Sequence, residues 1–327
     1  MLQARLTAYR PDNAALTRSI GSGVALRIGR GDDSGLRLDH ASISRAHAEL
    51  HEHDGAWQLR DLGSKNGTFV DGTPIAQAKL EHACWLRFGD VFCEFAPLSA
   101  AEVAADDSGR RARRAAATAH TARIDGLQRL DDLLDASLRG VLELAQCERG
   151  FVLLDNGGDG YSVRANLALD PARLATREFS GSVGAVRCAL EQRRSVVAND
   201  IGQEAWLASR ASVVAAGLSA LVCLPLLDGE STLGAIYADR VPPGAPITTL
   251  DLELLEAFAE RAALWIAARR ASKRLDSTAF DSSGFDSSDA ALPEWSDIVA
   301  AHVDDMQVGD MPAGDLPAAD LPAGDMR

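Results

Sequence analysis

The N-terminal part of the chain holds four side chains whose chemistry suits a phosphate group, namely Arg30, Ser44, Arg45 and Lys65. A phosphomonoester carries roughly 1.5 to 2 negative charges near neutral pH and three strong acceptor oxygens. Its binder therefore needs a guanidinium, for charge and fork geometry, and short donors for the remaining oxygens. All four residues fall at predicted strand ends or turns, where the loops of a sandwich can converge. We interpret them as a candidate phosphate-binding set.

The elements that must position these side chains are predicted to be β-strands. Short apolar runs alternate with turn signals over residues 1–98, at 24–28, 56–60, 68–70, 84–88 and 91–95. The pairs Asn66-Gly67 and Asp71-Gly72 are strong hairpin signals, because both residues of each pair can adopt positive φ. Many short strands at close spacing predict an all-β sandwich.

Three short motifs in this segment together resemble the forkhead-associated (FHA) family. They are Gly29-Arg30, Ser44-x-x-His47 and Asn66-Gly67, set within Arg27-Ile-Gly-Arg30 and Leu62-Gly-Ser-Lys-Asn-Gly-Thr68. The resemblance covers residues 1–98 and implies a β-sandwich that binds phosphothreonine, in preference to phosphoserine, in a partner protein. It does not identify the partner, because the loops that select the neighbouring peptide residues are the variable part of the family.

The resemblance also implies a role for each motif residue. Arg30 and Ser44 hold the phosphate, and Asn66 hydrogen-bonds the peptide backbone beside the phosphothreonine. Arg45 and Lys65 occupy positions that reach the phosphate in some relatives. The remaining motif residues support the site structurally, and they are Gly29, His47 and Gly67. His47 is expected to brace the loop behind Ser44, with no catalytic role.

Beyond this domain the composition changes twice. Residues 99–121 are rich in alanine, arginine and acidic residues and have few large apolar groups, so we expect a linker with some helical content. Residues 122–271 mix both periodicities. Apolar residues recur at three- and four-residue intervals from Ile124 to Val141, whereas 150–155 and 220–227 are continuous strand-like runs. We predict an α+β domain with helices flanking an antiparallel sheet.

This second domain resembles the GAF family. The residues that carry the resemblance are Glu148–Leu154, Asn199–Ile201, Leu221–Leu226, Leu233–Asp239 and the closing helix Leu252–Ala263. Relatives bind cyclic nucleotides, bilins, haem, small metabolites or nothing. The cyclic-nucleotide signature is not evident and no cysteine has a bilin-attachment context, so the GAF ligand stays unknown and we expect no cofactor. The resemblance favours dimerisation through the opening and closing helices, although their apolar stripes would equally pack on the sheet.

Residues 272–327 form an acidic low-complexity tail. They hold twelve acidic residues against three basic ones, and so nine of the 14 net negative charges of the chain. Prolines recur in the five-residue repeats after Asp310, which forbids a continuous helix, and we predict disorder. One island, 292–306, would form a helix with an apolar face. That face would dock a partner or pack on the body of the protein.

Several function classes are disfavoured. Neither half of the chain has the basic face that a nucleic-acid binder needs, and no apolar run is long enough to cross a membrane. The five cysteines are scattered, which predicts neither a metal site nor a disulfide framework and fits a cytoplasmic protein. No phosphate-binding Walker loop is present, and we do not expect an enzyme.

The sequence therefore favours a bacterial signalling adaptor that binds threonine-phosphorylated partners downstream of Ser/Thr kinases and forms a homodimer. The alternative is a small-molecule sensor in which the GAF pocket gates phosphopeptide binding or exposure of the tail. A third reading is an enzyme that uses thiol chemistry at Cys188 or Cys223. It would require a loss of activity in Cys188→Ser or Cys223→Ser, and a reductase of this kind would also need a cysteine pair, which the spacing does not establish.

Overall fold

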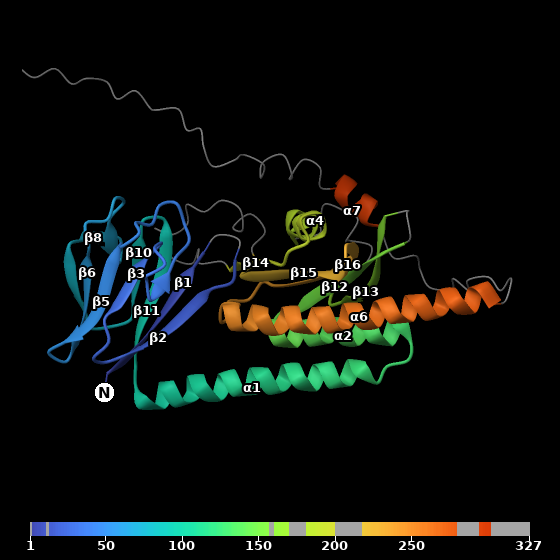
Figure 1. Cartoon of the computed structure of the whole chain (residues 1–327), viewed down its shortest axis with the longest axis horizontal. Coiled ribbons are helices and arrows are strands. Elements are labelled where there is room, and N and C mark those ends of the chain that lie inside the picture. Colours follow the sequence, from blue (N-terminus) through green and yellow to red (C-terminus); the bar gives the residue numbers. More distant parts are fainter. Residues whose placement is uncertain are drawn as a thin grey trace, which may run out of the picture.

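The computed structural model describes residues 2–10, 13–156, 160–169, 181–199, 218–279 and 294–301. Its N-terminal domain is a sandwich of two β-sheets (Figure 1). The strands are β1 Gln3–Tyr9, β2 Leu16–Gly21, β3 Leu26–Gly29, β4 Leu36–Arg37, β5 Ala48–His53, β6 Ala56–Asp61, β7 Thr68–Val70, β8 Thr73–Ile75, β9 Gln77–Leu80, β10 Cys84–Phe88 and β11 Val91–Leu98. One sheet has the order β2-β1-β11-β10-β7-β8 and the other β4-β3-β5-β6-β9.

The sandwich core forms where the inward residues of the two sheets meet. In β5, Ala48 and Leu50 are buried while Glu49 between them is not, which is the two-residue alternation of a half-buried strand. Trp57 of β6 and Phe95 of β11 come from opposite sheets, and their rings pack edge to face with centroids 6.3 Å apart. The expected all-β sandwich is confirmed.

A long helix, α1 (Ala100–Asp125), follows the sandwich and covers the segment 99–121 that we expect to be a linker. Its first turn has a capping box, in which the Ser99 hydroxyl accepts from the Glu102 amide and the Glu102 carboxylate accepts from the Ser99 amide. The helix buries Ala117, His120 and Ile124 against the second domain. The domain boundaries themselves stay a prediction.

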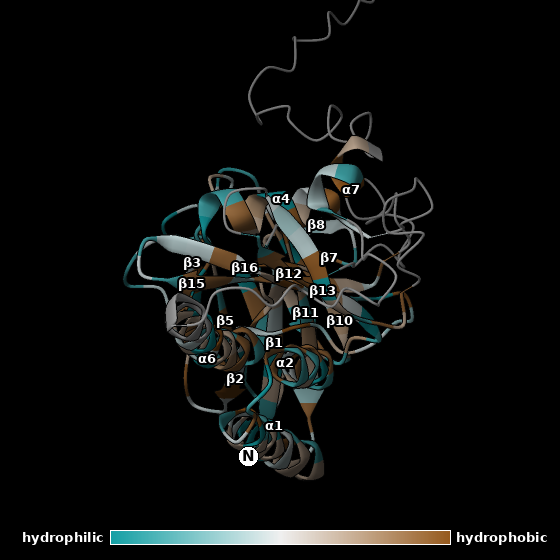
Figure 2. Ribbon diagram, turned by 90° about the vertical axis from the view of Figure 1, so that its right-hand side faces the viewer, coloured by the Kyte–Doolittle hydropathy of each residue, from teal (hydrophilic) through white to brown (hydrophobic). Residues whose placement is uncertain are grey.

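The second domain has a five-stranded antiparallel sheet with the order β13-β12-β16-β15-β14. Its elements are α2 Leu130–Ala145, β12 Arg149–Asp155, β13 Tyr161–Leu167, α4 Val183–Gln192, β14 Val196–Asn199, β15 Ala220–Asp228, β16 Ser231–Arg240, α6 Thr249–Ala279 and α7 Trp295–Ala301. Helices α2 and α6 cover one face of the sheet, with α1 outside them, whereas α4 and α7 lie on the other face (Figure 2). The predicted α+β class is confirmed.

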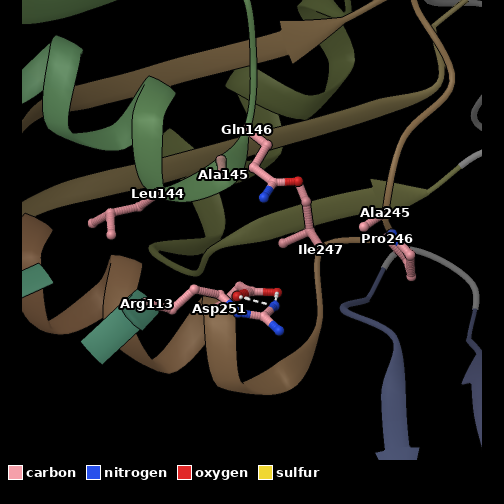
Figure 3. A pocket seen from close by; sticks show the side chains of 8 residues that line it. All are labelled: Arg113, Leu144, Ala145, Gln146, Ala245, Pro246, Ile247 and Asp251. Atoms are coloured by element: carbon pink, nitrogen blue, oxygen red, sulfur yellow. Dashed lines mark hydrogen bonds and ion pairs between the residues drawn. The ribbon is translucent and has the colours of Figure 1, made fainter. Parts of the chain in front are cut away.

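Direct contacts join the two domains. The Ala15 amide donates to the Ile247 carbonyl at 2.9 Å, and the Thr249 amide donates to the Ala15 carbonyl at 2.9 Å. Helix α1 reaches both domains, because Asp106 pairs with Arg5 of β1 at 2.9 Å and Arg113 pairs with the buried Asp251 of α6 at 2.9 Å. The second pair lies beside a small pocket at the junction (Figure 3).

Two sequence expectations need comment. The helical periodicity from Ile124 to Val141 is divided between α1 and α2, because the chain leaves the helix at Gly126 and re-enters at Leu130. Most of the acidic tail, including its five-residue repeats, lies outside the described residues. Within the tail, 272–279 are described as the end of helix α6, so the helix runs past the boundary expected at residue 271, and 294–301 are described as well. No described helix combines the length and the apolar character needed to cross a bilayer.

Candidate phosphate-binding site

Three loops at one end of the sandwich bring the candidate residues together. Arg30 begins the β3–β4 loop, Ser44 and Arg45 lie in the β4–β5 loop, and Lys65 and Asn66 lie in the β6–β7 loop. The Arg30 amide donates to the Ser44 carbonyl at 3.0 Å, and the Lys65 amide donates to the Ser44 hydroxyl oxygen at 3.0 Å. The Asn66 side chain donates to the Ser42 carbonyl at 2.8 Å. Ser44 is therefore the point at which the loops meet.

These hydrogen bonds orient the polar groups of the site and leave donors and acceptors that could bind a ligand. The Arg30 Nε donates to the Ile43 carbonyl at 3.2 Å, which directs the rest of the exposed guanidinium outward. Because the Asn66 amide nitrogen is occupied, its Oδ1 is the atom available to accept from a peptide N–H. Within the described residues, neither the Arg45 guanidinium nor the Lys65 ammonium has an acidic partner.

His47 connects the β4–β5 loop with the β6–β7 loop from a buried position in the sandwich. Its imidazole is fully buried, with Nδ1 accepting from the Ser44 amide at 3.1 Å and Nε2 donating to the Gly67 carbonyl at 3.1 Å. These partners fix the neutral tautomer with its proton on Nε2. Burial lowers the pKa of His47, which keeps Nδ1 free to accept. The geometry matches the supporting position that the sequence suggests for this residue.

Both motif glycines allow close packing that a side chain would prevent. A Cβ at Gly29 would lie 2.2 Å from the Arg45 carbonyl oxygen, so only glycine lets β3 approach the Ser44–Arg45 segment this closely. Gly67 has a φ of +78°, in the left-handed region, and a Cβ there would lie 3.2 Å from the Phe69 ring. The two glycines fix the backbone on either side of Ser44.

Sequence reasoning missed two residues that shape the loops. The Asp61 carboxylate accepts from the amides of Gly63 and Ser64 at 2.8 and 2.9 Å, and from the hydroxyls of Ser64 and Thr68 at 2.6 Å each. Burial acts to raise the pKa of Asp61, but these hydrogen bonds outweigh it and the net pKa is lowered. The run Asp61-Leu-Gly-Ser64 is the signal of an aspartate-capped turn that would have identified it.

The second missed residue is Ser42, which anchors the β4–β5 loop. It is buried, its carbonyl accepts from Asn66, and its hydroxyl oxygen accepts from the Asp90 amide at 2.9 Å. The hydroxyl also lies 2.8 Å from His40 Nδ1. Nothing in the sequence distinguishes Ser42 from an ordinary loop serine, because its partners come from segments up to 48 residues away.

Comparison with known families separates the two domains. A sequence profile described as the FHA domain matches residues 26–89, and one described as the GAF domain matches residues 129–266. The chain carries an FHA domain followed by a GAF domain. The FHA match spans all three site loops, whereas the GAF match spans the sheet, α2 and most of the packed part of α6.

Curated relatives are similar to about a quarter of the chain or less. The glycogen accumulation regulator GarA of Mycolicibacterium smegmatis is 36% identical over 84 residues, which are 26% of this chain and 51% of that protein. The oxoglutarate dehydrogenase inhibitor of Corynebacterium diphtheriae is 44% identical over 46 residues, 14% of this chain and 32% of that protein. This chain thus spans about half or less of the length of these bacterial relatives.

A solved structure, described as part of a structural and functional analysis of phosphothreonine-dependent FHA domain interactions, is also similar. It is 29% identical, covers 28% of this chain and 95% of its own, and has a TM-score of 0.26.

The described part of the GAF domain is well packed on its α4 face. Phe151 and Tyr237 stack with ring centroids 5.1 Å apart, and the Tyr237 hydroxyl donates to the buried Asp239 at 2.6 Å. Tyr237 is thus a core residue. Burial raises the pKa of the Cys223 thiol, which leaves it a poor nucleophile. No metal-ligating group of three side chains occurs among the described residues.

Proposed function

We propose that the FHA domain binds a phosphothreonine-containing segment of a partner protein at Arg30, Ser44, Arg45, Lys65 and Asn66. The observation that carries the proposal is the convergence of the three loops on Ser44, with the Arg30 guanidinium hydrogen-bonded to the carbonyl of the adjacent Ile43. An arginine and a short hydroxyl donor bind different oxygens of one phosphate, and charge-assisted bonds of this kind are the strong ones.

The roles that we propose for these residues are those that the family resemblance implies. Arg30 and Ser44 contact the phosphate, Arg45 and Lys65 contribute positive charge around it, and the Asn66 Oδ1 accepts from the peptide backbone. Gly29, His47 and Gly67 hold the loops and do not touch the ligand. The unpaired state of Arg45 and Lys65 within the described residues supports the second assignment, because an anion would complete their interactions.

The same proposal makes the protein a non-enzymatic adaptor that acts in the cytoplasm, downstream of Ser/Thr kinases. Two relatives are named for regulation and for inhibition of an enzyme, and both functions suit a domain that binds another protein. We favour the adaptor over the small-molecule sensor, because no feature of the described GAF residues points to a ligand.

We also propose that the GAF helices form a homodimer interface. Leu264 of α6 is 59% exposed although it is a large aliphatic residue, so the face of α6 that carries it is open to solvent. A second copy covering this face would remove Leu264 from water. Light scattering after size exclusion should give a dimeric mass for the wild type and a monomeric mass for Leu264→Glu, with Glu260→Gln on the same helix as control. A monomeric wild type would contradict the dimer.

A variant pair tests the phosphothreonine proposal. The full chain is screened against a degenerate phosphothreonine peptide library, and the consensus peptide is then titrated by fluorescence polarisation. Arg30→Ala should weaken binding about 10- to 100-fold, the value of a lost hydrogen bond to a charged group. Arg60→Ala is the matched control, because Arg60 is exposed on β6 and pairs with Glu49. Equal loss in both variants, or none in Arg30→Ala, would refute the assignment.

A further inference from the structure

The segment Glu294–Ala301 docks on the GAF domain beside an open sheet edge. Among the described strands, β13 is the last of its sheet, and its strand neighbour is β12 on one side. Glu294 forms an isolated antiparallel bridge with Ser162 of β13, and its carboxylate accepts from the Asn156 side chain at 3.0 Å. Helix α7 then continues over the α4 face of the sheet (Figure 1). The backbone pairing covers part of an edge that would otherwise be exposed.

The helix presents one apolar face to the domain. Ile298 is fully buried in the cluster that α4 and the sheet share, and Trp295 and Val299 pack against the same cluster. Positions 295, 298 and 299 have the i, i+3, i+4 spacing of one helical face. Ser296 and Asp297 lie on the opposite side and are exposed. The sequence island at 292–306 therefore packs on the body through its described part.

Helix α7 is too short to be stable when it is separated from the domain surface. Helix α7 has seven residues, and isolated helices shorter than about 12 to 15 residues are marginal in water. Among the described residues, its contacts with the domain include one fully buried side chain, two partly buried ones and the Glu294 contacts. An anchor of this size resembles the binding of a short helical peptide in a groove with an edge-strand pairing, two common modes of peptide recognition.

We propose that the surface formed by Asn156, β13 and the adjoining α4-side cluster is a peptide-binding seat. Its resident ligand is residues 294–301 of the same chain, and the segment leaves and returns as one unit. A competing ligand would need the same chemistry: an acidic residue for Asn156, followed by an aromatic and two aliphatic residues on one helical face. The seat is independent of the FHA site, and its occupancy regulates whether the GAF domain can bind such a segment.

Tethering explains why the resident segment would dominate. A segment joined to its own site by a short connection has an effective concentration of about a millimolar. If the free segment bound with a dissociation constant of about 0.1 mM, the tethered copy would weaken an added peptide on the order of tenfold. Removing the resident segment should therefore raise the affinity of the added peptide by about the same factor of ten.

The test uses the full chain and a labelled peptide of residues 290–303. The chain is prepared as wild type, as Ile298→Asp, which ejects the buried anchor, and as Ser296→Asp, the matched change on the exposed side of the same helix. We expect the peptide to bind Ile298→Asp about tenfold more tightly than the other two chains. A peptide that itself carries Ile298→Asp should bind none of them.

Four results would overturn the proposal. Equal peptide binding by all three chains would mean that the peptide binds outside the seat, and no binding by a folded Ile298→Asp chain would mean that the seat takes no peptide. A wild type of dimeric mass that becomes monomeric in Ile298→Asp would mean that the segment is exchanged between copies. If Ile298→Asp does not fold, hydrogen exchange on the wild type replaces it as the test. We expect the amides of α7 to exchange at least about tenfold faster than those of β12 and β16. Equal protection would mean that α7 does not leave the domain separately from the rest of the fold.

Discussion

Replacing His47 by alanine tests whether a buried side chain of the sandwich holds the loops of the candidate site in place. The imidazole is buried and bonds to both the Ser44 loop and the Gly67 turn. It makes no contact with a bound phosphate in the proposed arrangement. His47→Ala should therefore damage binding through the loops alone, without removing any proposed ligand contact.

The structure gives the size of the effect. The Ser44 amide loses its partner, and an unsatisfied buried donor costs about 1–3 kcal/mol. The Gly67 carbonyl loses less, because it also accepts from the Gly89 amide at 3.2 Å. The imidazole also packs edge to face on Phe88 with centroids 5.7 Å apart, so its removal leaves a cavity. We expect the FHA domain to lose about 2–4 kcal/mol of stability.

Hydrogen exchange measured by mass spectrometry on peptides from residues 26–89 gives the stability of this domain within the full chain. Phosphothreonine-peptide titration of the same samples gives the affinity. His53→Ala is the control, because His53 lies at the exposed end of the same strand, β5. The reasoning would be wrong if His47→Ala changed exchange and affinity no more than His53→Ala does.

Three further predictions follow from the loop geometry. Gly29→Ala should destabilise the FHA domain by about 1–3 kcal/mol and weaken peptide binding, because the new Cβ would overlap a loop carbonyl, whereas Gly21→Ala meets nothing within 4 Å and should leave thermal melting unchanged. Asp61→Asn should weaken binding several-fold relative to the exposed Asp54→Asn, since an amide nitrogen cannot accept the hydroxyl bonds that close the β6–β7 loop; equal titrations would contradict this. Burial lowers the pKa of His47 from its ordinary 6.5, so the unfolded chain binds a proton at this residue more readily than the folded chain does. The stability that His47 contributes is therefore complete above about pH 6.5 and is lost as pH falls below that value. The difference in melting temperature between the wild type and His47→Ala should shrink on acidification, and a constant difference would contradict the pKa shift.

Much of the fold could be predicted because it depends on local signals. The turn pairs Asn66-Gly67 and Asp71-Gly72 mark the ends of β7, and the alternation of apolar runs marks the sheets. The proposed phosphate ligands were identifiable because each has distinctive chemistry at a turn. The structure brings them together, and their binding of a ligand stays a prediction.

The rest depends on contacts that are distant in sequence. Ser42 holds its loop through a backbone donor 48 residues away, and such a contact leaves no pattern in the residue types. Helix α1 packs on α2 at Gly140, where a Cβ would lie 2.6 Å from the Phe258 ring and 3.4 Å from His120. The alanine-rich segment packs on the second domain through the three residues that it buries, Ala117, His120 and Ile124, although its composition alone suggests a solvated linker.

The central claim is that the FHA domain distinguishes phosphothreonine in a peptide. Its most direct test is calorimetric titration of the full chain with the library-derived peptide in three forms: phosphothreonine, phosphoserine and unphosphorylated threonine. We expect binding of the phosphothreonine form, at least about tenfold weaker binding of the phosphoserine form, and none of the unphosphorylated form. Equal binding of the phosphorylated and unphosphorylated peptides, or no binding of either by the folded chain, would contradict the account.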